Sequence, residues 1–152
     1  TDAMALLEAV DHVAQEREPN PDLYRMLRGA LRTLANHSHS PLLVAAFYWK
    51  LLALEGVGPV LDRCVSCESP DAPVALDPLL GGVLCRTCRP APGPWKAGPD
   101  AVELVRRILG GELGAALSEP PSAATAEVSA LAVGWMEHHL ERQLRAVRAL
   151  HG

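Results

Sequence analysis

The sequence has few aromatic residues and no long uninterrupted apolar run. Phe, Trp and Tyr together make up 4% of the 152 residues, so Leu, Ala and Val have to build the core. The longest apolar stretch, residues 42–54, is interrupted by Lys50 and is too short to span a bilayer. The sequence contains no recognisable signal peptide or targeting motif. These absences argue against a membrane protein, and the abundance of Leu and Ala favours helices.

Sequence motifs of catalysis are also absent. There is no phosphate-binding loop, nucleophile elbow, H-E-x-x-H motif or paired-carboxylate signal. We therefore expect a non-enzymatic binding or scaffolding module. The formal net charge of −4 argues against an extended electrostatic grip on nucleic acid, although it leaves room for a local basic patch. The chain begins with Thr rather than Met, so we expect a piece of a longer protein.

The chain concentrates its cysteines in one stretch. All four belong to two C-x-x-C pairs, Cys64 with Cys67 and Cys85 with Cys88, separated by seventeen residues. Two such pairs, or knuckles, at this separation are typical of a tetrahedral zinc site, and four thiolates leave no position open for water or substrate. The alternatives are a pair of disulfides or a thioredoxin-type redox pair. The doubled motif favours one structural Zn²⁺.

The residues between the knuckles predict a hairpin. Val74 to Leu76 and Val83 to Leu84 are short strand-forming runs, and Gly81-Gly82 provides a tight turn where positive φ is needed. This segment is too short and too polar to bury a core of its own. The metal then has to supply its folding energy, about 10–16 kcal/mol in isolated structural sites. Loss of a ligand, as in Cys67→Ser, should loosen the ribbon and leave much of the helical structure.

Hydrophobic periodicity and stop signals predict helices on both sides of this ribbon, over residues 1–17, 20–34, 42–55, 100–109 and 122–150. The helix over 42–55 is apolar on nearly every face, which indicates a central, buried position for its aromatic residues rather than a base-stacking platform. The last helix is expected to bury a stripe that continues through Leu144, Val147 and Leu150. The predicted fold is mainly α, a helical bundle with an inserted four-cysteine zinc ribbon. Its parts are 1–59 (first part of the bundle), 60–90 (ribbon) and 91–152 (a Pro- and Gly-rich linker and completion of the bundle).

Arginines occur in three groups. Those flanking the knuckles are candidates for contact with DNA phosphates: Arg63, Arg86 and Arg89. Two helical rows are candidates for partner binding, with a solvated face or helix-dipole complementarity as the ordinary alternative: Arg25, Arg28 and Arg32, and Arg142, Arg145 and Arg148.

One run of residues carries a family resemblance. Phe47 to Pro59, the first knuckle, and Gly81 to Cys85 together resemble the RecO family of DNA-repair proteins. Residues 20–34 and 144–150 resemble flanking segments of that family, with Arg148 at its usual basic position, so the resemblance covers essentially the whole chain. Glu68 stands where the family usually has Gly after the second cysteine. Ala45-Ala46 stands where some relatives have basic residues.

The resemblance implies a mediator of homologous recombination in the bacterial cytoplasm, associated with the nucleoid. The family binds and anneals DNA, works with RecR, and engages the single-stranded-DNA-binding protein so that the RecA recombinase can load. Its members carry an N-terminal OB-fold, a general binder of single strands. This chain looks like the C-terminal helical and zinc part alone, so its own DNA binding is expected to be weak.

The resemblance also predicts a peptide site around residues 42–54. An apolar groove there would hold the acidic, carboxylate-terminated tail of the single-stranded-DNA-binding protein, with an arginine row meeting the carboxylate. The row of Arg142, Arg145 and Arg148 is slightly favoured over that of Arg25, Arg28 and Arg32. The alternative function is a zinc-stabilised protein–protein interaction module that does not bind DNA. The salt dependence of DNA binding distinguishes the two functions.

Overall fold

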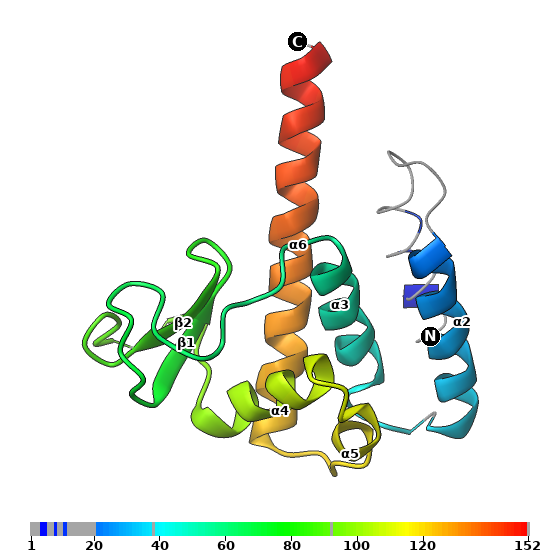
Figure 1. Ribbon diagram of the computed structural model, residues 1–152, viewed down its shortest axis with the longest axis horizontal. Coiled ribbons are helices and arrows are strands. Elements are labelled where there is room, and N and C mark those ends of the chain that lie inside the picture. Colours follow the sequence, from blue (N-terminus) through cyan, green and yellow to red (C-terminus); the bar gives the residue numbers. More distant parts are fainter. Residues whose placement is uncertain are drawn as a thin grey trace.

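The computed structural model describes residues 4, 5, 8, 11, 21–37, 39–91 and 93–151. The protein is mainly helical with one small antiparallel sheet, which confirms the predicted fold class (Figure 1). The helix predicted over residues 1–17 lies largely outside the described residues, and the four that are described there are helical. The elements in chain order are α2 (Pro21–Asn36), α3 (Leu43–Leu54), β1 (Pro73–Asp77), β2 (Gly82–Cys85), α4 (Pro99–Leu109), α5 (Leu113–Leu117) and α6 (Ala123–His151).

Helix boundaries fall close to the predicted start and stop signals. Pro21 opens α2 and Pro99 opens α4, positions where the missing amide hydrogen costs nothing. Gly56 ends the α3 region at a φ of +80°, a conformation that favours glycine. The short helix α5 was not predicted, because five residues are too few to show a helical period. Within the described part of the chain, no helix combines the length and hydropathy needed to cross a membrane.

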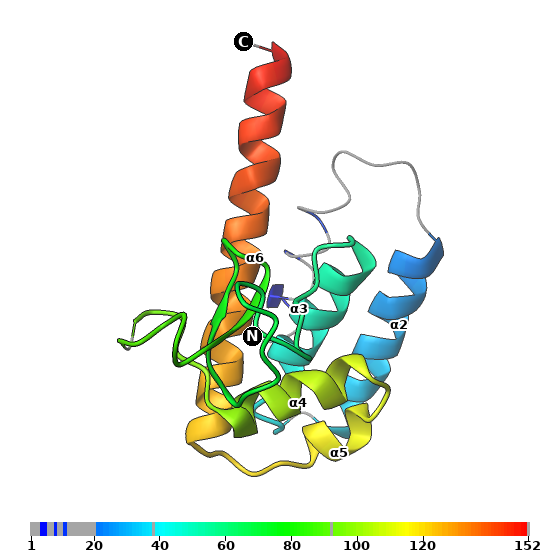
Figure 2. The same ribbon diagram turned by 60° about the vertical axis from the view of Figure 1, so that its left-hand side comes forward.

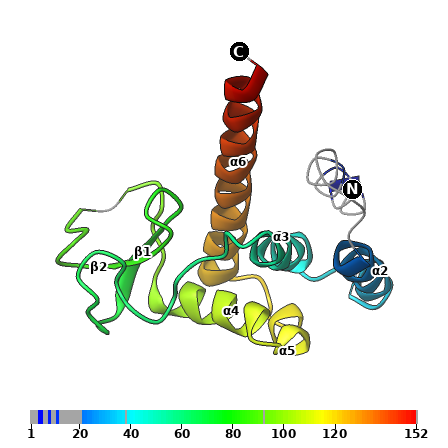
Figure 3. The same ribbon diagram turned by 45° about the horizontal axis from the view of Figure 1, so that its top comes forward.

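The core is built around α3, as predicted. Helices α3, α4 and α6 pack against one another, α2 packs on α3, and α5 lies against α4 and α3 (Figures 1 and 3). Trp49 of α3 and Trp135 of α6 are both buried, with ring centroids 5.6 Å apart and planes tilted by 59°. The indole of Trp135 donates a hydrogen bond of 2.9 Å to the carbonyl oxygen of Val57. The aromatic residues of this run therefore stabilise the packing of α3 on α6.

The hairpin of β1 and β2 is covered on both faces. Ala75 pairs with Leu84 and Leu76 with Val83, and neighbouring residues of a strand point to opposite faces. Leu76 and Val83 belong to the helical core, whereas Ala75 and Leu84 form a second buried cluster with two of the cysteines. The two-stranded sheet is thus a wall that the helical body and the cysteine site share.

The stretch predicted as a linker, residues 90–99, is partly attached to this wall. Leu76 donates a backbone hydrogen bond of 2.9 Å to Trp95, and Ala97 donates one of 3.1 Å to Val74. The Trp95 ring lies over Gly134 of α6, since a Cβ built on that glycine would come within 2.4 Å of it. The segment after the second knuckle therefore extends the sheet and anchors it to α6.

Only the first part of α6 is packed. Its 29 residues begin under α3 and α4, where Val128, Leu131 and Trp135 are buried. The prediction that the buried stripe continues to its end is wrong, because Leu144 is 50% exposed and Leu150 is 83% exposed. Figures 1 and 2 show the last turns of α6 standing clear of the other elements. Leu31 of α2 is also exposed.

Candidate metal centre and partner groove

The four cysteines converge on one point. Cys64 and Cys67 come from the turn before the hairpin, Cys85 ends β2, and Cys88 lies in the turn that follows. All four Sγ atoms lie within 4.8 Å of one another, and none of the four is in a disulfide. The Sγ atoms of Cys67 and Cys85 are 3.7 Å apart. A tetrahedron with metal–sulfur bonds of about 2.3 Å has edges of about 3.8 Å, so the donor set fits a four-thiolate metal site.

Each of the two knuckles contains a backbone turn of the same type. The amide of Glu68 donates to the carbonyl oxygen of Cys64 at 2.8 Å, and the amide of Arg89 donates to that of Cys85 at 2.9 Å. Glu68 has a φ of +64°, in the left-handed region where a side chain costs about 1–2 kcal/mol. The first knuckle therefore has the conformation that a glycine would adopt freely, and this chain accepts the cost of a glutamate there.

The thiols influence one another strongly. Burial raises the pKa of Cys64, but the backbone amides of Cys85, Cys67 and Ser66 outweigh burial and lower this pKa to about 6. The neighbouring Cys64 sulfur, followed by that of Cys67, raises the pKa of Cys88 to about 12. Without a cation, one thiolate in this cluster disfavours the next, since like charges repel. A bound metal ion would reverse that penalty and favour four thiolates.

The arginines beside the knuckles have different roles in the structure. Arg89 forms an ion pair of 2.5 Å with Asp77, whose buried side chain also accepts from the amide of Leu79 at 2.8 Å. Arg89 therefore holds the end of β1 and the hairpin turn to the second knuckle. Arg63 is exposed and pairs with Asp62 at 3.2 Å.

Arg86 lies in a different position. It is exposed and makes no ion pair with any residue that the structure describes. Arg86 and Lys96 line one hollow of about 560 Å³ beside β1 and the start of α4. Sequence analysis missed Lys96, because only the pairing of its segment with β1 brings it to the second knuckle.

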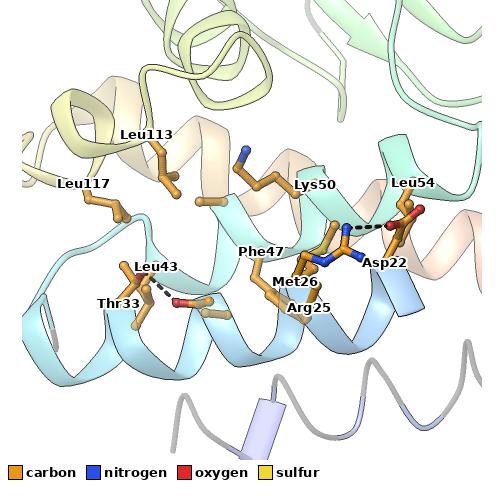
Figure 4. Close-up of a pocket in the computed structure, with 13 residues that line it drawn as sticks. Asp22, Arg25, Met26, Thr33, Leu43, Phe47, Lys50, Leu54, Leu113 and Leu117 are labelled. Carbon is orange, nitrogen blue, oxygen red and sulfur yellow. Dashed lines mark hydrogen bonds and ion pairs between the residues drawn. The ribbon is translucent and has the colours of Figure 1, made fainter. Parts of the chain in front are cut away.

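A groove lies between α2, α3 and α5, and its volume is about 430 Å³ (Figure 4). Phe47 and Met26 are among the mainly apolar side chains that form it. Arg25 and Lys50 supply two cationic side chains, and Arg25 pairs with Asp22 at 3.0 Å. The complete lining is Asp22, Arg25, Met26, Gly29, Ala30, Thr33, Leu43, Ala46, Phe47, Lys50, Leu54, Leu113 and Leu117.

The structure separates the candidate arginine rows. Of the row on α2, only Arg25 lines the groove; Arg28 and Arg32 are exposed outside it. The favoured row of Arg142, Arg145 and Arg148 lies on the exposed last turns of α6 and contributes nothing to the groove lining. In the sequence, Lys50 stands out only as an interruption of an apolar run. A lone cation on a central helix marks the place where that helix reaches the surface.

The fold and the site define a helical protein stabilised by a four-thiol ribbon and carrying an apolar groove with a cationic rim. Residues 2–148 match the family described as "Recombination protein O C terminal". The chain belongs to this family, which confirms the resemblance noted in the sequence.

Three relatives show the extent of this similarity. Each is a DNA repair protein RecO: the chain is 37% identical over 149 residues to the one from Frankia casuarinae, 37% over 150 residues to the one from Streptomyces coelicolor, and 35% over 150 residues to the one from Thermobifida fusca. Each alignment covers 97% of this chain but only 60–61% of the relative. The chain thus spans about three fifths of the length of these relatives.

Proposed function

We propose that this chain is the partner-binding and DNA-contacting C-terminal part of a recombination mediator of the RecO type, and that it has no catalytic activity of its own. The observation that carries the proposal is the apolar groove with Arg25 and Lys50 at its rim. Membership of the family supports DNA repair as the biological setting, and we place the protein in the bacterial cytoplasm, at the nucleoid. In that setting we expect RecR, DNA and the single-stranded-DNA-binding protein as partners.

Zinc is the metal that we assign to Cys64, Cys67, Cys85 and Cys88. Thiolate sulfur is a soft ligand, and a closed set of four thiolates is typical of structural zinc. The ion would hold the ribbon of residues 60–90 together, because the second cluster has only a few small or medium side chains besides the cysteines. No position on the metal is left for substrate, so the ion supplies folding energy and no chemistry.

The groove suits a short peptide that ends in a hydrophobic residue and a carboxylate. Its floor from Met26, Phe47 and neighbouring residues offers an apolar pocket for the anchor side chain. Arg25 and Lys50 can donate charge-assisted hydrogen bonds to the peptide carboxylates. Asp22 competes for Arg25, so a peptide carboxylate has to displace that ion pair. We therefore assign the tail of the single-stranded-DNA-binding protein to this groove and not to the arginines of α6.

The double substitution Arg25→Glu with Lys50→Glu is expected to weaken peptide binding by about 1–3 kcal/mol, which raises the dissociation constant by roughly 5- to 150-fold. Calorimetric titration with a synthetic acidic peptide ending in Phe measures this change.

The matched control is Arg28→Glu, on the same helix but outside the groove lining, which should bind as the parent does. Asp22→Asn should bind more tightly, because it frees Arg25 and removes a repulsive charge. Equal loss in the Arg28→Glu control, or loss only in Arg145→Glu with Arg148→Glu, would place the site elsewhere.

We assign DNA contact to Arg86 and Lys96 rather than to all three arginines beside the knuckles. Arg89 and Arg63 already have carboxylate partners, whereas Arg86 has none among the described residues. The hollow is lined by Arg86, Lys96 and the acidic Asp71, so its charged side chains leave a net positive charge. A phosphate there would lie at the N-terminal end of α4, where the helix dipole also favours an anion. Backbone contacts of this kind carry no sequence preference.

Arg86→Glu with Lys96→Glu is expected to weaken the binding of a single-stranded oligonucleotide. It should also flatten the slope of log affinity against log salt by about 0.7, the value for one lost phosphate contact on a single strand. Fluorescence anisotropy over a salt series measures both quantities. The same Arg28→Glu variant serves as control, since α2 lies on the opposite side of the molecule from the hairpin (Figure 1). A parent chain that binds peptide but shows no salt-dependent DNA binding would instead support the protein-only interaction module.

A further inference from the structure

The exposed end of α6 is the largest feature that the proposed function leaves unused. Residues 141–150 extend the helix by about 15 Å beyond its packed part. Nearly all of these side chains are exposed, and Figures 1, 2 and 3 show this end clear of the other elements. A helix end that carried only solvated residues would need no explanation. This one carries an ordered combination of apolar and charged positions.

An apolar stripe runs along this part of α6. At 3.6 residues per turn, Val133, Leu140 and Leu144 point within about 40° of one another. Val133 is 44% exposed and Leu144 is 50% exposed, while Leu140 is half-buried at the edge of the helical core. The fully buried side chains of α6, such as Leu131 and Trp135, lie on the opposite side of the helix from this stripe. Val133 and Leu144 are therefore open to a partner, and Leu140 between them keeps part of its surface open.

Four charged residues flank the stripe on one side, and their signs are segregated. Glu137, Glu141, Arg145 and Arg148 all fall within an arc of about 80° beside Leu144. All four are exposed. The two acids lie in the earlier turns and the two arginines in the later turns. Such a flank complements its own copy when the direction of the second helix is reversed, because the acidic half of each then faces the basic half of the other.

We propose that two copies of the chain associate through this face of α6 in an antiparallel, two-fold symmetric pair. The two-fold axis passes near residues 142 and 143, so Leu140 of each copy packs on Leu144 of the other. Glu137 then lies opposite Arg148 of the second copy, and Glu141 lies opposite Arg145. In a parallel pair, the two flanks would instead lie on opposite sides of the seam, so the acidic half of one could not face the basic half of the other. The seam is short and its ion pairs are exposed, so the association is weak and dependent on concentration.

Sedimentation equilibrium from low to high micromolar concentration tests the pair. The parent chain should show a monomer–dimer equilibrium, and Leu144→Glu should weaken it at least tenfold. The matched control is Leu79→Glu, which changes a leucine that is 68% exposed at the hairpin turn and should associate as the parent does. All of these positions are exposed, so circular dichroism should show the same helical signal for every variant. A parent that stays monomeric at every concentration, or a control that dissociates like Leu144→Glu, overturns the proposal.

Charge reversal tests the direction of the pair. Arg145→Glu with Arg148→Glu gives an all-acidic flank, and Glu137→Arg with Glu141→Arg gives an all-basic one. Each double variant alone should be monomeric, an equimolar mixture of the two should associate, and the chain carrying all four changes should dimerise like the parent. Association unaffected by these reversals overturns the proposal. So does a monomeric parent whose Arg145→Glu with Arg148→Glu variant loses oligonucleotide binding, since the row would then belong to nucleic acid.

Discussion

Cys67→Ser is expected to lower the metal content and unfold the region of the hairpin, while α3, α4 and α6 remain folded. Cys67 is exposed and Ser is close to it in size, so the change removes a ligand and almost no packing. It should lower metal affinity by more than the roughly 10–100-fold loss caused by substitutions in the outer shell of a metal site. The helices keep their own core, because only Leu76 and Val83 of the hairpin contribute to it.

Metal analysis of the purified protein is the first measurement, and one zinc ion per chain is expected. The Cys67→Ser variant should lose this zinc, become sensitive to protease between residues 62 and 94, and retain most of its ellipticity at the helical wavelength. Ser66→Ala, in the same knuckle but without a ligand atom, serves as control and should keep the metal. A parent chain isolated without metal would refute the assignment. Collapse of the helical signal in Cys67→Ser would show that the hairpin wall is essential to the whole body.

Gly82→Ala is expected to cost about 1–3 kcal/mol of folding free energy, the usual range for forcing extra volume into a packed site. A Cβ at this position would lie 2.5 Å from the carbonyl oxygen of Val60 and 2.7 Å from Cγ1 of Val65. Two hydrogen bonds keep the backbone of Val60 from moving away. Its amide donates to the carbonyl oxygen of Gly81 at 2.9 Å, and its carbonyl oxygen accepts from the amide of Val83 at 3.0 Å. Displacing it would also shift the segment that leads into the first knuckle, so metal affinity should fall as well.

Thermal unfolding followed by circular dichroism measures the cost. For a domain of this size, a loss of about 1–3 kcal/mol lowers the melting temperature by roughly 2–12 °C. Gly114→Ala is the matched control: a Cβ there meets nothing within 4 Å, and the residue is in α5. That change should be neutral or raise stability by up to about 1 kcal/mol, because Ala is the better helix former. A Gly82→Ala variant as stable as the parent would mean that the segment containing Val60 is not held where the structure has it.

Features that depend on short stretches of sequence were predictable. The spacing of the cysteines placed four ligands in one cluster, and the apolar run of residues 42–54 identified the central helix. Gly81, with a φ of +84°, matches the turn predicted at that pair, whereas Gly82 is needed for a different reason. It makes room for Val60, a contact that no local pattern reveals.

Features that depend on which element packs where were not predictable. The period of α6 continues past Leu144, but a period reports an amphipathic helix and not the presence of something to bury it. Arg89 looked like a free cation because its partner Asp77 lies in another element. Lys50 and Arg25 reach one groove only because α2 packs on α3, and the sequence gives no measure of that packing.

The shared wall of β1 and β2 constrains how the length of the ribbon can change in evolution or engineering. One residue inserted within either strand would turn every later side chain to the opposite face. Leu76 would then point at the thiols, and Ala75 would leave a void against the helices. Insertions and deletions should therefore accumulate in the exposed turns, at residues 70–72 and around Leu79 and Leu80, where added residues leave the alternation of the strands intact.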